Sequence, residues 1–415
     1  MKKLIQINTV CNGSTGNIMY QIQKYAQDNG YETLSLYGRR NGFKDVLCAK
    51  YGNVISFWIH VILTTVFDAH GLGSYFHTRR MVKRIQKEKP DIIHLHNIHG
   101  YYLNLPILFN YLKNQYTGKI VWTFHDCWPM TGHCPHFVAV QCNKWKEECG
   151  NCPNKKIYPI SWGLDGSKRN YYMKKQLFTA VKDMVIICPS KWLRDIVKQS
   201  YLKEAKCVVV PNGIDLKTFY PREEDTVTQK YNLPIDKKII LGVASVWDER
   251  KGLKVFKALA NSISEKYEIV LVGLSKRQIA RLPKNMIGIP KTESADELAQ
   301  LYTKSTIFIN PSKEESFSLV TIEAMACGTP VIAMDTSAPK ELVKDINGIL
   351  LSDSRVENYL EAIHYIEGKR FSRKKIVDSV QQYSVENMTN SVLEIYERIL
   401  MTENFRRRND VINKT

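Results

Sequence analysis

One segment decides how the chain folds: Asn310-Pro-Ser-Lys-Glu-Glu-Ser-Phe-Ser-Leu-Val-Thr-Ile-Glu-Ala-Met-Ala-Cys-Gly-Thr-Pro330. It follows the apolar run Thr306–Ile309, which has the length and composition of a buried strand. The residues from Leu319 to Ala326 predict a helix, with Gly328 as its stop and Pro330 beyond it. A strand, a polar loop and a helix in this order indicate one repeat of a parallel α/β sheet.

The same alternation of strands and helices runs through almost the whole chain. The Val/Ile/Leu-rich runs are continuous, which is typical of parallel strands covered by helices on both faces. A first series of strands is predicted at Leu4–Val10, Thr33–Tyr37, Ile92–His96, Ile120–Phe124 and Met184–Cys188. A second series is predicted at Cys207–Val210, Ile239–Val243, Glu268–Val272, Met286–Ile289, Thr306–Ile309 and Val331–Met334. We therefore expect an α/β fold with parallel sheets and right-handed crossovers.

The length of 415 residues predicts two domains of about 200 residues each. The turn Pro211-Asn212-Gly213 and the polar stretch after it indicate where the halves separate. The predicted parts are an N-terminal domain (1–205) with a Cys-rich insert (about 127–160), a C-terminal domain (206–375) and a final region (376–415). We expect the final region to be a helix that packs back on the N-terminal domain and ends in a basic tail, Arg406–Arg408.

Two glutamates make the opening segment a candidate site. Glu315 falls in the strand-to-helix loop, and Glu323 lies eight residues further on, inside the helix. Ligands of open α/β sheets bind at this edge, where carboxylates accept hydrogen bonds from hydroxyls and helix N–H groups meet phosphate. By spacing alone, two solvated glutamates near a helix start are an equally good interpretation.

The pair Glu315 and Glu323, followed by Ala324-Met-Ala-Cys-Gly-Thr-Pro-Val-Ile-Ala333, resembles the signature of glycosyltransferase family 4, and the resemblance covers nearly the whole chain. It implies the GT-B fold, in which two Rossmann-like domains face each other across a cleft. It also implies a retaining transfer from a nucleoside-diphosphate sugar, with Glu315 facing the donor sugar and Glu323 binding the ribose. The subgroup it resembles makes capsules and exopolysaccharides.

The resemblance extends to the residues between the two glutamates. Ser316, Phe317, Ser318 and Leu319 are implied to line the donor. Ser316 and Ser318 stand where the family often has glycine, so we expect a stiffer loop.

A basic pair precedes a helix in the second half. Arg250 and Lys251 follow the strand Ile239–Val243, and cations at a helix start can neutralise a leaving diphosphate alongside the helix dipole. Without the resemblance, a solvated helix start is the simpler interpretation. Lys251 matches the basic pair of the family, but the usual arginine lies earlier, where this chain has Val246, so Arg250 is its predicted substitute. No metal or other cofactor is then needed for catalysis.

The N-terminal half contributes further candidates. Gly13 and Gly16 follow the first strand and resemble the family's glycine-rich loop, although any βα turn can carry two glycines. His125 ends a strand where the family places a functional histidine near the donor sugar. Asn97, His99 and Asp126 are predicted on the acceptor side.

Five of the ten cysteines occur between Cys127 and Cys152. A structural zinc bound by Cys134, Cys142, Cys149 and Cys152 is one interpretation, and buried free thiols are the other. In either case we expect this stretch to support structure or shape the acceptor site.

The net charge of +18 favours phosphate-bearing partners or an anionic membrane, and no nucleic-acid motif accompanies it. The apolar stretch Val54–Phe67 is too short to span a bilayer, and it predicts a buried or interfacial helix or, alternatively, a membrane-contacting one. The chain opens without a secretory signal, so we expect a cytoplasmic protein at the inner face of the cytoplasmic membrane. Its expected partners are a nucleotide sugar and a lipid-linked saccharide.

Three other functions compete with transfer. A nucleotide-sugar epimerase and a glycogen-type phosphorylase would share the fold, and a non-catalytic module would use it to hold anionic polymer or membrane. The combination of Glu315, Glu323 and Lys251 favours the transferase over the binding module.

Overall fold

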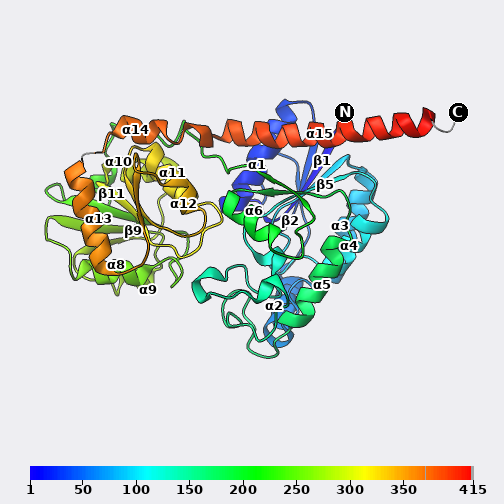
Figure 1. Ribbon diagram of the computed structural model, residues 1–415, viewed down its shortest axis with the longest axis horizontal. Coiled ribbons are helices and arrows are strands. Elements are labelled where there is room, and N and C mark those ends of the chain that lie inside the picture. Colours follow the sequence, from blue (N-terminus) through cyan, green and yellow to red (C-terminus); the bar gives the residue numbers. More distant parts are fainter. Residues whose placement is uncertain (370, 413–415) are drawn as a thin grey trace. The chain divides into compact units, whose positions relative to one another are not determined.

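The computed structural model describes residues 1–369 and 371–412, with side chains up to residue 401. The chain forms two compact units, which Figure 1 shows as separate α/β bodies. Residues 1–211 and those from 388 onward form the first unit, and residues 212–387 form the second.

The first unit is a parallel sheet with strand order β3-β2-β1-β4-β5-β6-β7. Its strands are β1 (Lys3–Val10), β2 (Glu32–Arg39), β3 (Cys48–Lys50), β4 (Ile92–Leu95), β5 (Lys119–Thr123), β6 (Val185–Cys188) and β7 (Lys206–Val209). Its helices are α1 (Gly13–Asp28), α2 (Val54–Phe67), α3 (Tyr75–Glu88), α4 (Leu105–Asn114), α5 (Ser167–Thr179) and α6 (Lys191–Lys198). The strand order reverses between β1 and β4, and ligands of such sheets bind at the carboxyl ends of the strands beside this point.

The second unit repeats the plan with strand order β10-β9-β8-β11-β12-β13, again all parallel. Its strands are β8 (Lys238–Val243), β9 (Tyr267–Val272), β10 (Met286–Ile289), β11 (Ile307–Asn310), β12 (Val331–Met334) and β13 (Gly348–Leu351). Its helices are α7 (Val227–Lys230), α8 (Leu253–Ala260), α9 (Lys276–Ile279), α10 (Ala295–Lys304), α11 (Leu319–Ala326), α12 (Pro339–Leu342), α13 (Val356–Lys369) and α14 (Arg373–Asp378). The order reverses between β8 and β11.

The α/β prediction with parallel sheets is confirmed, and α11 has the predicted bounds. One strand was assigned to the wrong series. The run Cys207–Val210 lies in β7, which pairs with β6 and completes the first sheet, and the first unit ends at Pro211, in the segment that the sequence indicated. Two strands were not predicted, because β3 has three residues and β13 begins at a glycine.

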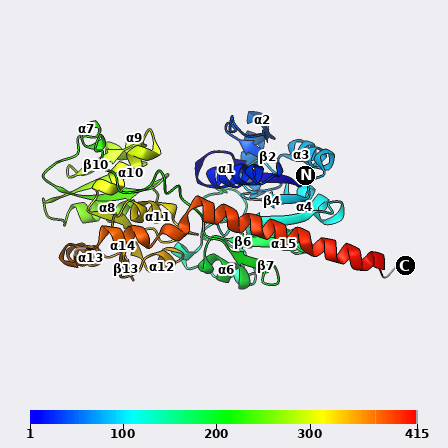
Figure 2. The ribbon, with the colours of Figure 1, turned by 90° about the horizontal axis from the view of Figure 1, so that it is seen from above.

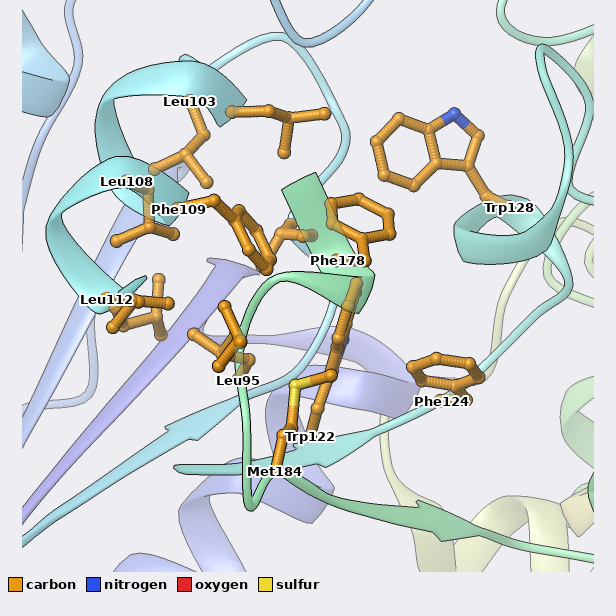
Figure 3. Packing of buried hydrophobic residues seen from close by; sticks show 14 of the residues in the cluster. Leu95, Leu103, Leu108, Phe109, Leu112, Trp122, Phe124, Trp128, Phe178 and Met184 are labelled. Carbon is orange, nitrogen blue, oxygen red and sulfur yellow. The ribbon is translucent and has the colours of Figure 1, made fainter. Parts of the chain in front are cut away.

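Aromatic side chains fill one face of the first sheet (Figure 3). The Trp122 ring on β5 lies 5.0 Å from that of Phe178 and 4.8 Å from that of Phe124, both edge to face. Phe109 on α4 lies 4.5 Å from Phe178. Such edge-to-face pairs add to the burial energy of the rings and hold the carboxyl end of β5 in place, directly before His125.

The C-terminal segment belongs to both units. After α14 and a single 3-10 turn (Gln381–Tyr383), α15 (Val385–Ile412) begins. In the first unit, Met388, Val392 and Tyr396 of α15 pack in one cluster with Leu4 and Ile22, and Figure 2 shows α15 running along that unit. The expected basic tail lies in the last turns of α15, beyond the described side chains.

The two chain segments that cross between the units pair with each other inside the second unit. Ile214 forms a parallel bridge with Ser384, and its N–H donates to the Tyr383 carbonyl over 2.9 Å. A Cβ atom on Gly213 would lie 2.5 Å from the Ser384 oxygen, so no side chain fits there. Gly213, in the segment where the sequence predicted a turn, therefore permits this close backbone contact.

Candidate active site

The loops after β8 and β11 meet at the point where the second sheet reverses its strand order. The N–H of Lys313 donates to the Arg250 carbonyl over 3.0 Å, and Arg250 Nη1 donates to the Glu314 carbonyl over 2.9 Å. Gly252 has a φ of +78°, and a Cβ atom there would lie 2.7 Å from Pro311. These contacts bring the predicted basic pair and Glu315 together, although they are 64 residues apart in the sequence.

Lys251 and Glu315 form an ion pair and a hydrogen bond in this site. Burial raises the pKa of Glu315, but the positive charges of Lys251 and Arg250 outweigh burial and hold that pKa below its usual value. The N–H of Glu315 donates to Ser337 Oγ over 2.9 Å, which fixes the loop to the segment after β12. The site therefore holds an ionised carboxylate beside two fixed cations.

Ser318 adopts a backbone conformation that favours glycine. Its φ is +87° and its ψ is +73°, and it immediately precedes α11. Its Oγ lies 2.8 Å from Thr321 Oγ1 and accepts a hydrogen bond of 2.9 Å from Asn310 Nδ2, so it does not cap the first turn of the helix. An uncapped helix start of this kind suits an anion. The side-chain hydrogen bonds offset part of the backbone strain.

The remaining residues of the predicted donor loop are buried or half-buried. Phe317 is buried against Tyr383, with ring centroids 5.8 Å apart. Ser316 and Leu319 are half-buried.

Glu323 lies in the middle of α11 and is half-buried. Tyr302 Oη donates to its Oε2 over 3.0 Å. Burial raises the pKa of Glu323 to about 7, although the hydrogen bond from Tyr302 opposes this. The two predicted glutamates therefore have opposite electrostatics: Glu315 is ionised beside two cations, and Glu323 titrates near neutrality.

The carboxyl edge of the first sheet carries Gly13 and Gly16. A Cβ atom on Gly16 would lie 2.3 Å from the carbonyl carbon of Cys11, so the first turn of α1 packs directly on the end of β1. Gly13 has a φ of +77° with open space around its Cα. Asn12, the N-cap residue, makes no capping bond and instead accepts from Arg40 over 3.3 Å. This helix start therefore also receives no side-chain cap.

His125 takes part in a series of hydrogen bonds that determines its tautomer. Gln6 Nε2 donates to the Met19 carbonyl over 2.9 Å, so Gln6 Oε1 faces His96 Nε2 at 3.0 Å and requires a proton there. Nδ1 of His96 is then an acceptor, and His125 Nε2, at 3.1 Å, is the donor. Burial lowers the pKa of His125 to about 4. At neutral pH it is a neutral imidazole whose Nδ1 is an acceptor.

The three acceptor-side candidates also lie at this edge. His99 Nε2 lies 2.8 Å from Asp126 Oδ2, and its Nδ1 lies 3.0 Å from Tyr158 Oη. Burial raises the pKa of Asp126, but His99 more than offsets this and the pKa falls to about 2. The carboxylate is therefore ionised. The backbone carbonyl of Asn97 accepts from Thr9 Oγ1 and Tyr102 Oη, both at 2.9 Å.

The Cys-rich insert is built from short 3-10 turns (Trp128–Met130, Val138–Val140 and Lys144–Lys146) rather than strands. Cys134 and Cys152 hydrogen-bond to each other, which lowers the pKa of Cys152 to about 7, and Cys149 Sγ accepts from the Gly132 N–H over 3.2 Å. Across the described residues, no group of three or more ligand-type side chains is placed to hold a metal ion. Cys134, Cys142, Cys149 and Cys152 line one small pocket together with His133, and all four are free thiols in the structure.

Other polar contacts hold the insert in place. Nζ of Lys174 is buried, donates to the carbonyls of Trp128 (2.9 Å) and Thr131 (3.0 Å), and lies 3.3 Å from the centre of the Trp128 ring. His133 Nδ1 lies 2.7 Å from the buried carboxylate of Asp68. Burial lowers the pKa of Lys174 to about 7.

Several supporting residues were not predicted from the sequence. Tyr302 and Asn310 orient the donor loop, while Gln6 and Tyr158 orient the histidines. Asn310 carried a usable signal, because a polar side chain at the carboxyl end of a strand lies at the binding edge. Tyr302 and Tyr158 lie far from their partners in sequence, and no pattern links them.

Two family models match consecutive parts of the chain. Glycosyltransferase Family 4 matches residues 16–218, and glycosyl transferases group 1 matches residues 223–383. The first therefore covers the larger part of the first sheet, and the second covers the whole second sheet with its candidate site.

Individual proteins are similar to the chain over nearly its full length. The WcaC protein of Escherichia coli strain K12, named for glycosyl transfer in colanic acid biosynthesis, is 23% identical over 85% of this chain and 88% of its own. Sucrose-phosphate synthase from Thermosynechococcus elongatus superposes with a TM-score of 0.73 at 19% identity, covering 97% of this chain and 100% of its own. Anabaena HepE, solved with UDP and glucose, has a TM-score of 0.68 at 16% identity, covering 96% of this chain and 100% of its own.

Proposed function

Because this chain belongs to glycosyltransferase family 4, we propose that it moves a sugar from a nucleoside-diphosphate sugar to a saccharide acceptor with retention of anomeric configuration. The observation that carries this proposal is the cluster of Lys251, Arg250 and Glu315 at the point where the second sheet reverses its order. The two domains with parallel sheets have the GT-B architecture of the solved glycosyltransferases.

In this proposal the second unit binds the donor. Lys251 and Arg250 stabilise the charge that develops on the leaving diphosphate, and the start of α11 adds its N–H groups. Glu315 faces the donor sugar and Glu323 accepts hydrogen bonds from the ribose hydroxyls. The geometry supports these roles because Tyr302 occupies only one oxygen of Glu323. The complex of HepE with UDP and glucose favours a uridine diphosphate donor.

The first unit provides a neutral imidazole and the ionised carboxylate of Asp126. Nδ1 of His125 is an acceptor suited to a sugar hydroxyl, and Gly13 and Gly16 let a ligand come close to the backbone at this edge. Asn97, His99 and Asp126 form the acceptor side. We propose a same-face displacement, in which the leaving phosphate takes the proton of the attacking hydroxyl. The cations at the donor site neutralise the diphosphate, so this mechanism requires no metal.

The biological setting follows from the similarity to WcaC. A glycosyl transferase named for colanic acid biosynthesis favours surface polysaccharide assembly, such as a capsule or exopolysaccharide, on a lipid-linked acceptor. All ten cysteines are free thiols, which supports a reducing compartment and hence action at the inner face of the cytoplasmic membrane.

A donor screen tests the proposal. Purified protein is incubated with UDP-, GDP- and other nucleotide sugars, with and without lipid-pyrophosphate saccharides, and free nucleoside diphosphate is measured. We expect release from one donor to require the acceptor, and the product to keep the anomeric configuration of the donor. Conversion of the donor without an acceptor would indicate an epimerase, and dependence on inorganic phosphate a phosphorylase. Binding without turnover would support the non-catalytic module.

A further inference from the structure

Helix α2 has its polar side inward and its apolar side outward. The side chains of His60 and Thr64 are buried, and Ser56, one turn before them, is half-buried. The buried stripe is held by polar contacts: His60 Nδ1 lies 3.0 Å from Ser74 Oγ, and its Nε2 accepts from the Gly71 N–H over 3.1 Å. An ordinary surface helix buries its apolar stripe instead.

The outward face of α2 is a continuous run of large apolar side chains. Ile55 is 71% exposed and Ile59 is 51% exposed. Phe67, the last residue of the helix, is exposed at its end, and the exposed residues along the outward side are Val54, Ile55, Trp58, Ile59, Ile62 and Val66. They follow helical spacing along one side, and α2 lies at the periphery of the first unit in both Figure 1 and Figure 2.

The end of the Cys-rich insert widens this apolar face. The N–H of Trp162 donates to the Thr65 carbonyl over 2.9 Å, and the N–H of Leu164 donates to the Val66 carbonyl over 2.8 Å. Both side chains are mostly exposed, with 74% exposure for Trp162. We call the outward residues of α2 together with Trp162 and Leu164 the α2 face. A monomer in water rarely leaves so many large apolar side chains together on its surface.

The cations near α2 are complementary to an anionic surface. In the sequence, residues 46–87 contain one acid, the buried Asp68, and the cations Lys50, Arg79, Arg80, Lys83, Arg84 and Lys87, of which Arg84 pairs with Glu88. Two cations contact the borders of the face: Lys155 Nζ donates to the Gly163 carbonyl over 2.9 Å, and Arg169 Nη2 donates to the Phe67 carbonyl over 3.1 Å. Asp165, beside Leu164, accepts hydrogen bonds from backbone N–H groups.

We propose that the α2 face is a docking surface for an anionic phospholipid bilayer. Among the described residues, no helix is long and apolar enough to cross a membrane. A 14-residue helix with an apolar outer side lies in the plane of the interface, where basic neighbours meet the headgroups. Trp58 and Trp162 suit this depth, because tryptophan prefers the boundary between lipid and water. This surface goes beyond the proposed transfer reaction and does not depend on it.

Vesicle sedimentation of the full chain tests the proposal. The variant Ile55→Gln/Ile59→Gln removes apolar area from the face without touching the core. The control Ile235→Gln/Ile346→Gln changes two isoleucines of the second unit, which are 88% and 46% exposed. With vesicles of phosphatidylcholine and phosphatidylglycerol, we expect binding of the first variant to be weaker by about tenfold and that of the control to match the wild type. Binding of the wild type should weaken with salt and with phosphatidylcholine alone.

Three results would overturn the docking surface: a wild type that stays in the supernatant, equal binding by both variants, or a wild-type dimer that Ile55→Gln/Ile59→Gln converts to a monomer without any vesicle binding. The last result would make the α2 face an interface between two copies. The assay uses no nucleotide sugar. A chain that binds vesicles but transfers no sugar would therefore count against the proposed function alone.

Discussion

The carboxyl edges of both sheets carry buried titratable side chains, but the two edges stabilise these side chains in opposite ways. In the second unit Lys251, Arg250 and Glu315 compensate one another, so the carboxylate stays ionised even though it is largely enclosed. In the first unit the enclosed histidines give up their charge, and hydrogen bonds from Gln6 through His96 fix the tautomer of His125. The edge of the second sheet therefore offers two cations, and the edge of the first sheet offers a neutral imidazole of fixed tautomer next to the ionised carboxylate of Asp126.

This difference matches what each edge is proposed to bind. A diphosphate brings charge that fixed cations can stabilise without reorganisation. A sugar hydroxyl needs acceptors of defined direction, and a neutral imidazole with a fixed tautomer provides one. The following four predictions test this contrast between the cationic edge of the second sheet and the histidine edge of the first.

The largest effect is expected from the cationic edge of the second sheet. Lys251→Met should lower kcat/KM for transfer by about 10²- to 10³-fold and weaken the binding of nucleoside diphosphate, because the diphosphate loses its paired cation. Steady-state kinetics and calorimetry measure both. Lys254→Met is the matched control, since Lys254 forms an exposed pair with Glu249 one turn away. Equal losses in both variants would remove Lys251 from the site.

A substitution at the histidine edge of the first sheet should affect turnover and not the binding of nucleotide. His125→Ala should lower kcat by about 10²-fold and leave the Kd of nucleoside diphosphate unchanged, because the imidazole is proposed to meet the sugar and not the nucleotide. The exposed His364 on α13 provides the control His364→Ala. Weaker nucleoside diphosphate binding by His125→Ala would contradict the separation of the two roles.

The pKa of Glu323, about 7, predicts that donor binding depends on pH. As pH rises through this value the carboxyl loses its proton and can accept hydrogen bonds from both ribose hydroxyls. Donor affinity should therefore increase about tenfold from one unit below the pKa to one unit above it. His125 stays neutral throughout.

Glu323→Gln should make the affinity independent of pH over this range. Lys174 in the insert also has a pKa of about 7, so a pH dependence that survives in Glu323→Gln would point to the first unit instead.

The smallest effect concerns the left-handed residue before α11. Ser318→Gly should be more stable than Ser318→Ala by about 1 kcal/mol, because both lose the hydroxyl contacts and only alanine keeps the strain. At Ser316, which has no positive φ, the order of the two variants should reverse. Denaturant unfolding measures all four. The same order at both positions would mean that Ser318 carries no strain.

Much of the fold was predictable because its signals are local. Continuous apolar runs locate most strands, and the Gly-Thr-Pro stop ends α11 where the structure ends it. The strand Cys207–Val210 was assigned to the second series because β7 has the same composition as the strands of the second sheet, and only its pairing with β6 reveals its place. Strand pairing joins residues that are far apart in the sequence, and the periodicity of apolar residues does not show which strands pair.

Lys251 and Glu315 were predictable because charged side chains in the loops after two strands lie at the carboxyl edge of the sheet. The site was not predictable where distant partners decide protonation, as with Gln6 for His125 or Tyr302 for Glu323. The contacts of the cysteines were not predictable from their spacing either. Cys134 and Cys152 contact each other, and Cys149 accepts a hydrogen bond from a backbone N–H.

The ion pair between Lys251 and Glu315 has a consequence for the order of events in turnover. A diphosphate that enters the site must displace Glu315 as the ionic partner of Lys251. When the diphosphate leaves, Glu315 can pair with Lys251 again. The carboxylate thus acts as a resident competitor of the product. We expect departure of the nucleoside diphosphate to proceed by exchange of partners, so that the lysine is never left unpaired and the enzyme is not trapped by its own product.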